Sequence, residues 1–587
     1  MVGKAKALLQ LHIDTTLAMG ATILLMVVLA SVFDFRYDLN DDVLIHDILS
    51  GNYTGVPSGH NIQMLYPLSG ILALCYRIGR AIPWYGIFLC TSQFFCFYLL
   101  VQRILTYAEH KVAKYFLLLV SVSFFLVFQY NTLVVVQYTV VAGLLAATGI
   151  FLFLTAPLVS TTKEMLKVNW ISLVLLLVAY CLREEIVLLF LPLLCVTGVI
   201  KWMQEKELWK MQVIAKYVAL MGAFLIGMLL CLGIHYMAYG SQEWKTFQVF
   251  FDQRTDLYDY ATIPDYESNG EFYESIQMEE SQQQLLVNYN YAMDSRIDVE
   301  VMTAVAEYAT QIWQDAHPFS TQLRNSLWSY RYRTFYMEQE TLTQSDYPYN
   351  YMVIILYGSI LLMIAYAKSY RYFFAIGLLL GVRSSLWLYL IYGMRTPVRI
   401  TMPLYYVEAC ILLGMLLYFM KDKIVQKYGF AYVMASIVFL GGIWQFSYLS
   451  NCLQDTIAFQ EEQDQVNDAI REYAKSNPEN VYFIDVYTFV YFSEEIFAKR
   501  DNSLDNYGII GGWAATSPVE TKRLEALDVS GIDMAFIEEE GVYFVNGTQY
   551  STDWLVAYYK DKGIEVRVEV VDELLDGQIE IIQLQKV

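Results

Sequence analysis

The sequence predicts a polytopic α-helical membrane protein with about eleven transmembrane helices, followed by a C-terminal extracytoplasmic α/β domain. Three observations lead to this fold class. Apolar residues occupy 56% of the 587 positions and charged residues only 17%, and the mean hydropathy is +0.37. A soluble chain of this length normally carries more charge. Several apolar runs, such as 16–32, 84–101 and 213–234, are long enough to cross about 30 Å of hydrocarbon as helices.

Eleven stretches are expected to span the bilayer. They lie near residues 14–33, 84–103, 115–130, 132–154, 168–182, 185–202, 212–238, 351–367, 371–391, 398–420 and 429–449. The first stretch is followed by further spans and by no small-residue cleavage site, so we interpret it as a retained helix. The stretch 62–80 is apolar but short, contains Pro67 and Gly70, and carries Arg77 and Arg80. We expect it to lie along the outer interface instead of spanning.

The distribution of positive charge decides the orientation, because Lys and Arg concentrate in cytoplasmic loops. With 62–80 outside the bilayer, fifteen Lys and Arg residues fall in cytoplasmic segments and six in the short outer segments. If 62–80 spanned, the numbers would be seven and fourteen. We therefore predict a multi-pass protein of the plasma membrane with a cytoplasmic N-terminus and an extracytoplasmic C-terminus.

Two domains are expected, a transmembrane domain at 1–454 and a soluble extracytoplasmic α/β domain at 455–587. The first contains a first outer loop, 34–83, and a large outer loop, 240–350, in which the pattern at 301–313 indicates a helix. In the second, alternation and apolar runs predict strands at 481–486, 533–537, 542–546, 564–571 and 578–584, with helices near 461–475, 519–527 and 552–561.

The net charge of −20 is concentrated in the predicted outer regions. Residues 240–350 hold 18 Asp and Glu against 6 Lys and Arg, and residues 455–587 hold 27 against 10. Such an acidic surface argues against a nucleic-acid partner, since phosphate binding needs a basic face. The sequence also lacks a phosphate-binding glycine motif, a zinc-binding spacing and a disulfide framework.

Carboxylates gather directly after the first span, at Asp34, Asp38, Asp41 and Asp42. One interpretation is structural, because Asn40 can cap a helix whose dipole favours acidic residues in its first turn. The other is functional, since ionisable groups close to the bilayer need a reason to be there. Successive helical residues point about 100° apart. Asp41 and Asp42 therefore cannot both face one substrate atom, and we expect one to be a general base and the other a support.

Further candidates occur at the other outer turns. His60 lies in a loop rich in Gly and Pro and fits either a binding role or an ordinary interfacial histidine. Arg183, Glu184 and Glu185 sit between two apolar spans and fit either a polar cavity lining or a structural Arg–Glu bridge. Arg395 and Arg399 flank the turn before the tenth span, where a guanidinium suits either phosphate oxygens or lipid headgroups.

The chain resembles the GT-C superfamily of membrane glycosyltransferases. Asn40-Asp41-Asp42 matches the acidic motif that these proteins carry after their first span, and 62–80 matches their interfacial helix. The segments DDVLIHDILSGNYTG and MLYPLSGILALCYRIGRAIPWYG are similar to the first outer loop of bacterial members. The region with Gly511-Gly512-Trp513 and Ser517-Pro518 looks like the end of poorly characterised bacterial membrane proteins.

The resemblance implies an inverting transferase that moves a sugar from a polyprenyl-phosphate donor to an acceptor glycan, lipid or protein on the outer face. Asp41 or Asp42 would be the base, and Arg183, Arg395 or Arg399 would stabilise the departing lipid phosphate. A divalent metal is an open question, because family members differ in needing one. Three alternatives remain: a polymerase or ligase acting on polyprenyl-diphosphate glycans, a transporter, and a non-catalytic scaffold in contact with membrane lipids.

Overall fold

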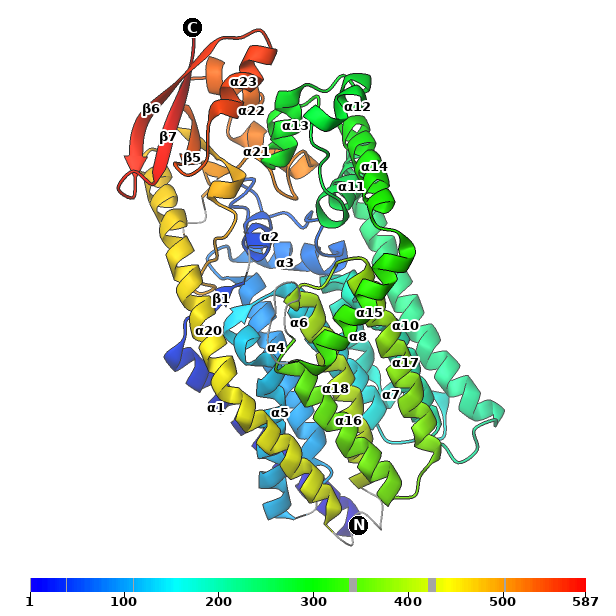
Figure 1. The fold of residues 1–587 in the computed structure, drawn as a ribbon. Helices are drawn as coiled ribbons and strands as arrows, with labels where there is room; N and C mark the ends of the chain where they lie inside the picture. Colours follow the sequence, from blue (N-terminus) through cyan, green and yellow to red (C-terminus); the bar gives the residue numbers. More distant parts are fainter. Residues whose placement is uncertain (1, 39, 109, 337–345, 421–428, 501–502) are drawn as a thin grey trace.

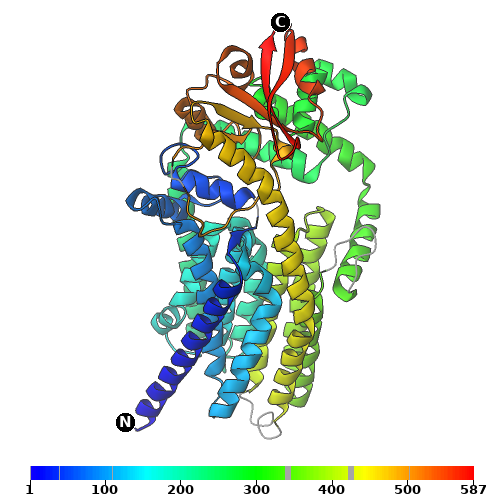
Figure 2. The same ribbon diagram turned by 90° about the vertical axis from the view of Figure 1, so that its left-hand side faces the viewer.

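The computed structural model describes residues 2–38, 40–108, 110–336, 346–420, 429–500 and 503–587. This part of the chain forms three layers: a bundle of long helices, a middle layer of short helices and loops, and an α/β domain (Figure 1). The N-terminus lies at the far end of the bundle and the C-terminus in the α/β domain (Figure 2). The middle layer therefore separates the two larger parts.

The bundle is built from long apolar helices, as the sequence predicts. The helices of the bundle, of which only α7 is short and polar, are α1 (Val2–Val32), α4 (Trp84–Leu105), α5 (Lys111–Val134), α6 (Tyr138–Thr155), α7 (Thr162–Val168), α8 (Trp170–Leu182), α9 (Glu184–Trp202), α10 (Met211–Ala238), α16 (Tyr349–Tyr366), α17 (Arg371–Tyr392), α18 (Val398–Met420) and α20 (Phe430–Ser476). Among the described residues, 10 helices are long and apolar enough to cross a membrane. The pair α7 and α8, bent by 59°, brings the number to 11 if it forms one span. The polytopic helical fold is thus confirmed.

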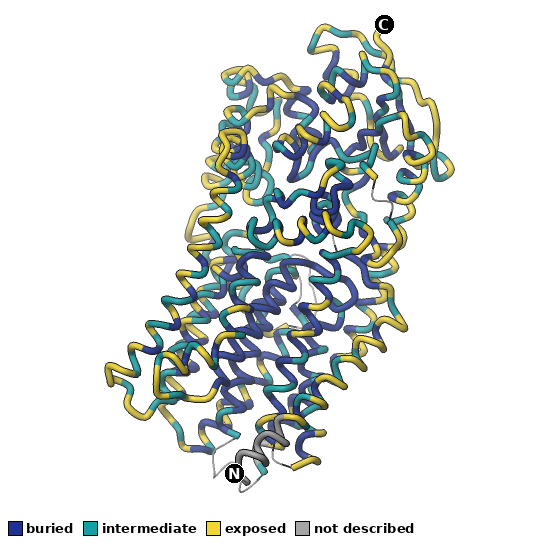
Figure 3. Tube along the Cα trace, turned by 180° about the vertical axis from the view of Figure 1, so that it is seen from behind, coloured by how far each residue is buried: buried dark blue, intermediate teal, exposed yellow. Residues whose placement is uncertain are grey.

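Helices α6 and α18 form the centre of the bundle. All residues of α6 are buried, and almost all of α18, and buried residues follow the middle of the bundle in Figure 3. Helix α6 has no charged residue, and its small residues allow close approach: a Cβ on Gly143 would lie 2.5 Å from Pro403 of α18. A helix that is apolar on every side belongs inside a bundle, whereas α1 and α10 expose most of their apolar side chains at its rim.

The stretch 62–80 forms α3 (Tyr66–Ile78), a helix of 13 residues. This is shorter than the roughly 20 residues that cross a bilayer. Pro67 stands in the first turn, where proline is tolerated, and the helix ends at Gly79. Together with α2 (Asn40–Ser50), it lies in the middle layer (Figure 1). The expectation of a short interfacial helix agrees with this placement.

The first outer loop is fixed on both sides by backbone hydrogen bonds. Strand β1 (Arg36–Tyr37) pairs in parallel with β2 (Val135–Val136), at the junction of α5 and α6. On its other side, the Tyr37 N–H donates to the Glu494 carbonyl at 2.9 Å, and the Ile496 N–H donates to the Phe35 carbonyl at 2.8 Å. The chain that enters α2 is therefore held between the bundle and the α/β domain.

The large outer loop is mostly helical. It contains α11 (Gln242–Thr255), the π-helical turn η1 (Asp256–Tyr260), η2 (Glu267–Asn269), α12 (Gly270–Ser275), α13 (Glu280–Val287), η3 (Tyr291–Met293), α14 (Val299–Ala316) and α15 (Phe319–Phe335). The helix that the sequence predicts at 301–313 is α14. Part of this loop packs against the α/β domain through α13 and α23 (Asp553–Asp561).

The α/β domain has one five-stranded sheet in the order β4-β3-β5-β7-β6. Its strands are β3 (Val481–Ile484), β4 (Tyr507–Ile509), β5 (Val542–Gly547), β6 (Val566–Leu574) and β7 (Ile579–Lys586), accompanied by η4 (Val486–Thr488), α21 (Pro518–Ala526), α22 (Ile532–Glu538) and α23. Strand β3 is parallel to β4 and β5, while β7 is antiparallel to β5 and β6. The carboxyl ends of β3 and β4 therefore open at one edge of the sheet.

Three details differ from the sequence-based expectations. The strand expected at 533–537 is wrong, since these residues form helix α22; a short apolar run does not distinguish strand from helix by periodicity. The last span and the helix expected at 461–475 are one 47-residue helix, α20, which runs from the bundle into the α/β domain. Strand β4 was not expected, because only three residues pair.

Candidate functional site

A cavity of about 410 Å³ lies in the middle layer, where the first outer loop, the large outer loop and the α/β domain meet. Helix α2 supplies one wall, α11 and η1 a second, and the carboxyl ends of β3 and β4 a third. The residues that line it are Asn40, Asp41, Leu44, Asp47, Tyr53, Arg254, Tyr258, Asp259, Tyr289, Asn467, Val486, Tyr487, Phe489, Val490, Phe492, Glu494, Asp505, Tyr507, Gly508, Ile509, Gly511, Gly512, Trp513 and Arg523. Ligands commonly bind outside the carboxyl ends of parallel strands, so this position suits a binding site.

The two adjacent carboxylates of α2 have different surroundings. Asp41 is partly exposed and lines the cavity. Asp42 is completely buried, where its Oδ1 accepts hydrogen bonds from the Tyr85 hydroxyl at 2.8 Å and the Tyr138 backbone N–H at 3.2 Å. Burial raises the pKa of Asp42 well above its usual value, against the effect of the Tyr85 hydrogen bond. Asp41 is therefore placed to meet a ligand, and Asp42 joins α2 to α4 and α6.

Asp38 and Arg399 lie close to Asp41. Burial raises the pKa of Asp38 to about 6; the Arg399 charge opposes this rise and the Asp41 charge adds to it. Arg399 is half-buried in the first turn of α18. Within the described part of the chain, no carboxylate lies within 4.0 Å of Arg399 and no hydrogen bond is made by its side chain. Arg399 is therefore a guanidinium close to Asp38 without an ion-pair partner in the part of the chain that the structure describes.

Arg183 holds the segment below α2 in place. Its Nη1 donates to Gln63 Oε1 at 2.6 Å, its Nε lies 3.0 Å from Glu185 Oε2, and its guanidinium lies 5.5 Å from the Tyr138 ring centre. Burial lowers the pKa of Arg183, but nearby Tyr138, Glu185 and Asp41 outweigh it and raise the pKa above its ordinary value. The bridge to Glu185 favours the structural interpretation, and Arg183 does not line the cavity.

Glu184, Glu185 and Arg395 border the site without forming its wall. Glu184 and Glu185 begin α9, where the helix dipole favours acidic side chains, and Glu185 is largely exposed. Arg395 Nη2 lies 2.5 Å from Asp259 Oδ2, and its guanidinium lies over the Tyr260 ring. Because Asp259 lines the cavity, Arg395 acts there only through its ion pair.

His60 lies outside the cavity, in an aromatic cluster. Its ring is stacked on Trp244 at 5.6 Å between centroids and packs against Tyr66 and Tyr239. Its Nε2 lies 3.3 Å from the Ala238 carbonyl, and burial lowers its pKa. In this position His60 ties the first outer loop to α10 and α11.

Sequence inspection missed Arg254, the clearest cation of the cavity wall. Its guanidinium lies 5.1 Å from the ring centre of Tyr289 and 5.7 Å from those of Phe251 and Tyr258, and its Nε donates to the Tyr291 hydroxyl at 3.1 Å. No carboxylate of the described residues lies within 4.0 Å of it. The signal was hidden because these aromatic residues lie up to forty positions apart and only the fold brings them together.

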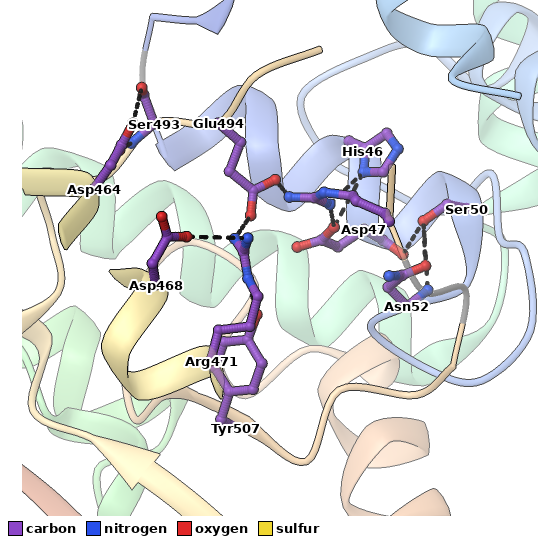
Figure 4. Close-up of polar contacts among 11 residues, drawn as sticks. His46, Asp47, Ser50, Asn52, Asp464, Asp468, Arg471, Ser493, Glu494 and Tyr507 are labelled. Carbon is purple, nitrogen blue, oxygen red and sulfur yellow. Dashed lines mark hydrogen bonds and ion pairs between the residues drawn. The ribbon is translucent and has the colours of Figure 1, made fainter. Parts of the chain in front are cut away.

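A second missed feature is a network of charged groups that attaches α2 to the α/β domain (Figure 4). Arg500 bridges Asp47, at 2.7 Å, and Glu494, which also pairs with Arg471. Burial raises the pKa of Asp47, but Arg500 and His46 outweigh it and hold the pKa below its usual value. His46 is buried beside this network, and its Nδ1 lies 3.1 Å from Asp47 Oδ1. The cavity wall is thus fixed by ion pairs.

The described residues contain no group of three or more His, Cys, Asp or Glu side chains arranged to hold a metal ion. A requirement for a divalent metal stays an open expectation of the sequence.

Comparisons with known proteins give the following findings. No protein-family model matches the chain, and no curated protein matches its sequence. Two crystal structures of ArnT from Cupriavidus metallidurans are similar in fold. The one bound to undecaprenyl phosphate has a TM-score of 0.38 and 10% identity, over 97% of this chain and 97% of that chain. The structure in the apo state has a TM-score of 0.38 and 11% identity, over 96% and 97%.

Proposed function

We propose that this protein is a membrane glycosyltransferase that moves a sugar from a polyprenyl-phosphate donor to an acceptor on the outer face of the membrane. The observation that carries the proposal is the pairing of opposite charges in one cavity. Asp41 and Arg254 both line it, and neither has an ion-pair partner within 4.0 Å among the described residues. A carboxylate and a guanidinium that line one cavity, neither in an ion pair among the described residues, suit proton removal and phosphate stabilisation together.

In this mechanism Asp41 takes the proton of an acceptor hydroxyl as its oxygen attacks the anomeric carbon. The bond from that carbon to the phosphate oxygen breaks on the opposite face, and the lipid phosphate leaves with the electron pair. Arg254 neutralises the charge that develops on the phosphate, which is why no leaving-group acid is needed. Arg399 does not line the cavity, and it contributes positive charge beside Asp38. Attack opposite to the leaving group inverts the anomeric configuration.

The remaining predicted site residues have supporting roles in this proposal. Asp42 fixes α2 against α4 and α6 through Tyr85 and Tyr138. Arg183 holds Gln63 and Glu185 below Asp41, and Arg395 positions Asp259 in the wall. These groups orient the cavity without contacting the reacting atoms.

The test is transfer from a panel of radiolabelled polyprenyl-phosphate sugars by the purified full chain in lipid nanodiscs. We expect Asp41→Asn to reduce transfer at least about a hundredfold, the usual contribution of a general base. Asp34→Asn is the matched control, because Asp34 is exposed and outside the cavity. Transfer by Asp41→Asn at the level of the unchanged protein would reject the proposal.

Arginine variants distinguish the proposed function from its main alternative. Arg254→Gln should lower kcat, while Arg567→Gln, an exposed arginine on β6, should have no effect. A polymerase or ligase acting on polyprenyl-diphosphate glycans predicts that Arg254→Gln abolishes activity with a diphosphate-linked donor while Asp41→Asn has little effect. The two variants together therefore distinguish the two reactions.

A further inference from the structure

A second cavity, of about 650 Å³, opens between the large outer loop and the α/β domain. Its walls come from α13 and the turn after it, from the carboxyl end of β3, and from α23 and the connection that precedes it. The lining residues are Glu280, Ser281, Gln284, Asn288, Asp485, Tyr487, Gln549, Tyr550, Ser551, Asp553, Trp554, Ala557, Lys560 and Asp561. Its volume falls within the range of small-molecule binding sites, about 300–1,000 Å³.

Tyr487 lies between this cavity and the first one, because it lines both. Its hydroxyl donates to the Val287 carbonyl at 3.1 Å, which fixes the ring against the large outer loop. Asp485 is buried, and it is held by Asn290 at 2.7 Å and by the Thr488 backbone N–H at 3.0 Å. The wall between the two cavities is therefore preformed.

The lining chemistry suits a sugar. Tyr487 and Tyr550 are exposed, with ring centroids 6.2 Å apart and planes inclined by 34°, and Trp554 lies in the same wall. Pyranose rings have apolar C–H faces that pack on aromatic rings and hydroxyl edges that need amide, hydroxyl or carboxylate partners. Gln284, Asn288 and Gln549 supply the amides. The buried Ser281 hydroxyl, also in the lining, has no hydrogen-bond partner among the described residues.

The charge of the second cavity narrows the ligand class. Four carboxylates line it, from Glu280, Asp485, Asp553 and Asp561, against the single cation of Lys560. Like charges repel, so a phosphate group or a uronic acid is disfavoured there, whereas a neutral or amino sugar is not. A neutral or amino-sugar glycan therefore fits the lining of the second cavity better than an acidic ligand does.

We propose that the second cavity binds the acceptor, a neutral or amino-sugar glycan whose chain passes Tyr487 and presents its terminal hydroxyl to Asp41. Its role as an acceptor site rests on the proposed glycosyltransferase function, but glycan binding itself does not. The large outer loop and the α/β domain then form one acceptor site, and this gives the docked C-terminal domain a function.

The experiment measures binding of the purified full chain to an array of oligosaccharides that includes cellohexaose, chitohexaose, a chitosan hexamer and hexagalacturonate. We expect binding to neutral or amino glycans but not to hexagalacturonate, and about tenfold weaker binding in Tyr550→Ala and in Gln284→Ala. Tyr491→Ala is the control, because Tyr491 is exposed but lines neither cavity.

The outcomes separate this inference from the proposed function. Asp41→Asn should bind glycans like the unchanged protein even though its transfer is lost. Absence of binding to every neutral and amino glycan, preference for the acidic one, or undiminished binding in Tyr550→Ala would each overturn the acceptor site. If Asp41→Asn retained transfer while glycan binding behaved as expected, the proposed mechanism alone would fail.

Discussion

Asp41 and Asp42 are adjacent in α2, but only Asp41 faces the cavity, while Asp42 has a supporting role. The sequence predicts this division, because adjacent helical residues point in different directions. It does not predict which residue faces the cavity, since that depends on where α4 and α6 pack. Tyr85 and the Tyr138 backbone occupy the side of α2 that carries Asp42, and Asp41 is left at the open side.

The Asp42 contacts predict a graded effect on stability. Asn retains an oxygen that can accept from Tyr85 and Tyr138, so Asp42→Asn should fold with a small loss. Asp42→Ala leaves both buried donors without a partner, at a cost of about 1–3 kcal/mol for each. Thermal unfolding of the two variants in nanodiscs checks this. Equal melting temperatures for Asn and Ala would contradict the hydrogen-bonding role.

Asp505 predicts a pH dependence of stability. Burial, with the nearby Asp47 charge, raises its pKa to about 7. Between about pH 4 and pH 7 the folded protein then keeps a proton that the unfolded chain has released, so stability falls as the pH rises through this window. The side chain of the Asp505→Asn variant cannot ionise. Between pH 5 and pH 8 the melting temperature of this variant should therefore fall by about 1–2 °C less than that of the unchanged protein.

The control for this pH series is Asp315→Asn, on an exposed part of α14. This variant should follow the pH profile of the unchanged protein. A profile for Asp505→Asn that coincides with both would contradict the assignment of the shifted pKa to Asp505.

Among the elements, α20 is the main connection between membrane and α/β domain. It is one continuous helix of 47 residues, and Arg471 near its end pairs with Glu494, which Arg500 links to Asp47 of α2. A continuous helix transmits its orientation better than a flexible linker does. The α/β domain is therefore held over the cavity by α20 from one side and by this ion-pair network from the other.

A substitution at Gly511 tests how closely the large outer loop packs against the α/β domain. A Cβ at this position would lie 1.8 Å from the Tyr289 carbonyl oxygen, which is backbone and cannot rotate away. Gly511→Ala should therefore destabilise the docked domain by roughly 1–3 kcal/mol. Limited proteolysis and thermal unfolding measure the effect. Gly270→Ala is the control, because nothing lies within 4 Å of the added atom; equal behaviour of the two variants would contradict the contact.

The elements differ in how far the sequence could predict them. Spans, the short helix at 66–78 and most strands follow from local hydrophobic pattern, length and proline position. Helix α22 was expected as a strand, because its apolar residues are too few to show a period. The continuity of α20 was missed because its composition changes from apolar to charged near residue 455 while the backbone remains helical. A change in composition indicates a change of surroundings from membrane to water, and it does not indicate that the helix ends.

The candidate site was less accessible to sequence reasoning than the fold. The acidic turn at 40–42 is a local signal, and it was found. Arg254 and Tyr289 meet through the folding of the large outer loop, and Glu494 reaches the same cavity only through the docking of the α/β domain. Such a site has no spacing that a single sequence reveals. Arg183 and His60 were selected for unusual position alone, and the structure gives each a packing role.

On the scale of the whole molecule, both cavities lie at one end of the bundle. Both cavities, the acidic turn of α2 and the α/β domain lie on the side opposite the N-terminus (Figures 1 and 2). The interior of the bundle is mostly apolar, although it also holds buried ion pairs such as Arg383 with Glu408 and Lys114 with Asp14. Helix α6 and most of α18 are buried. A substrate therefore binds in the first cavity at one face of the membrane. A reporter fused to the C-terminus can identify that face.

The positive-inside distribution predicts that this face is extracytoplasmic. Alkaline phosphatase fused after Val587 should be active in a bacterial host, because it folds only outside the cytosol, and green fluorescent protein at the same position should be dark. The same reporters placed before the first residue should give the reverse pattern. A C-terminal fusion that fluoresces would place Asp41 and both cavities in the cytosol, and transfer from a donor presented on the outer face would then be impossible.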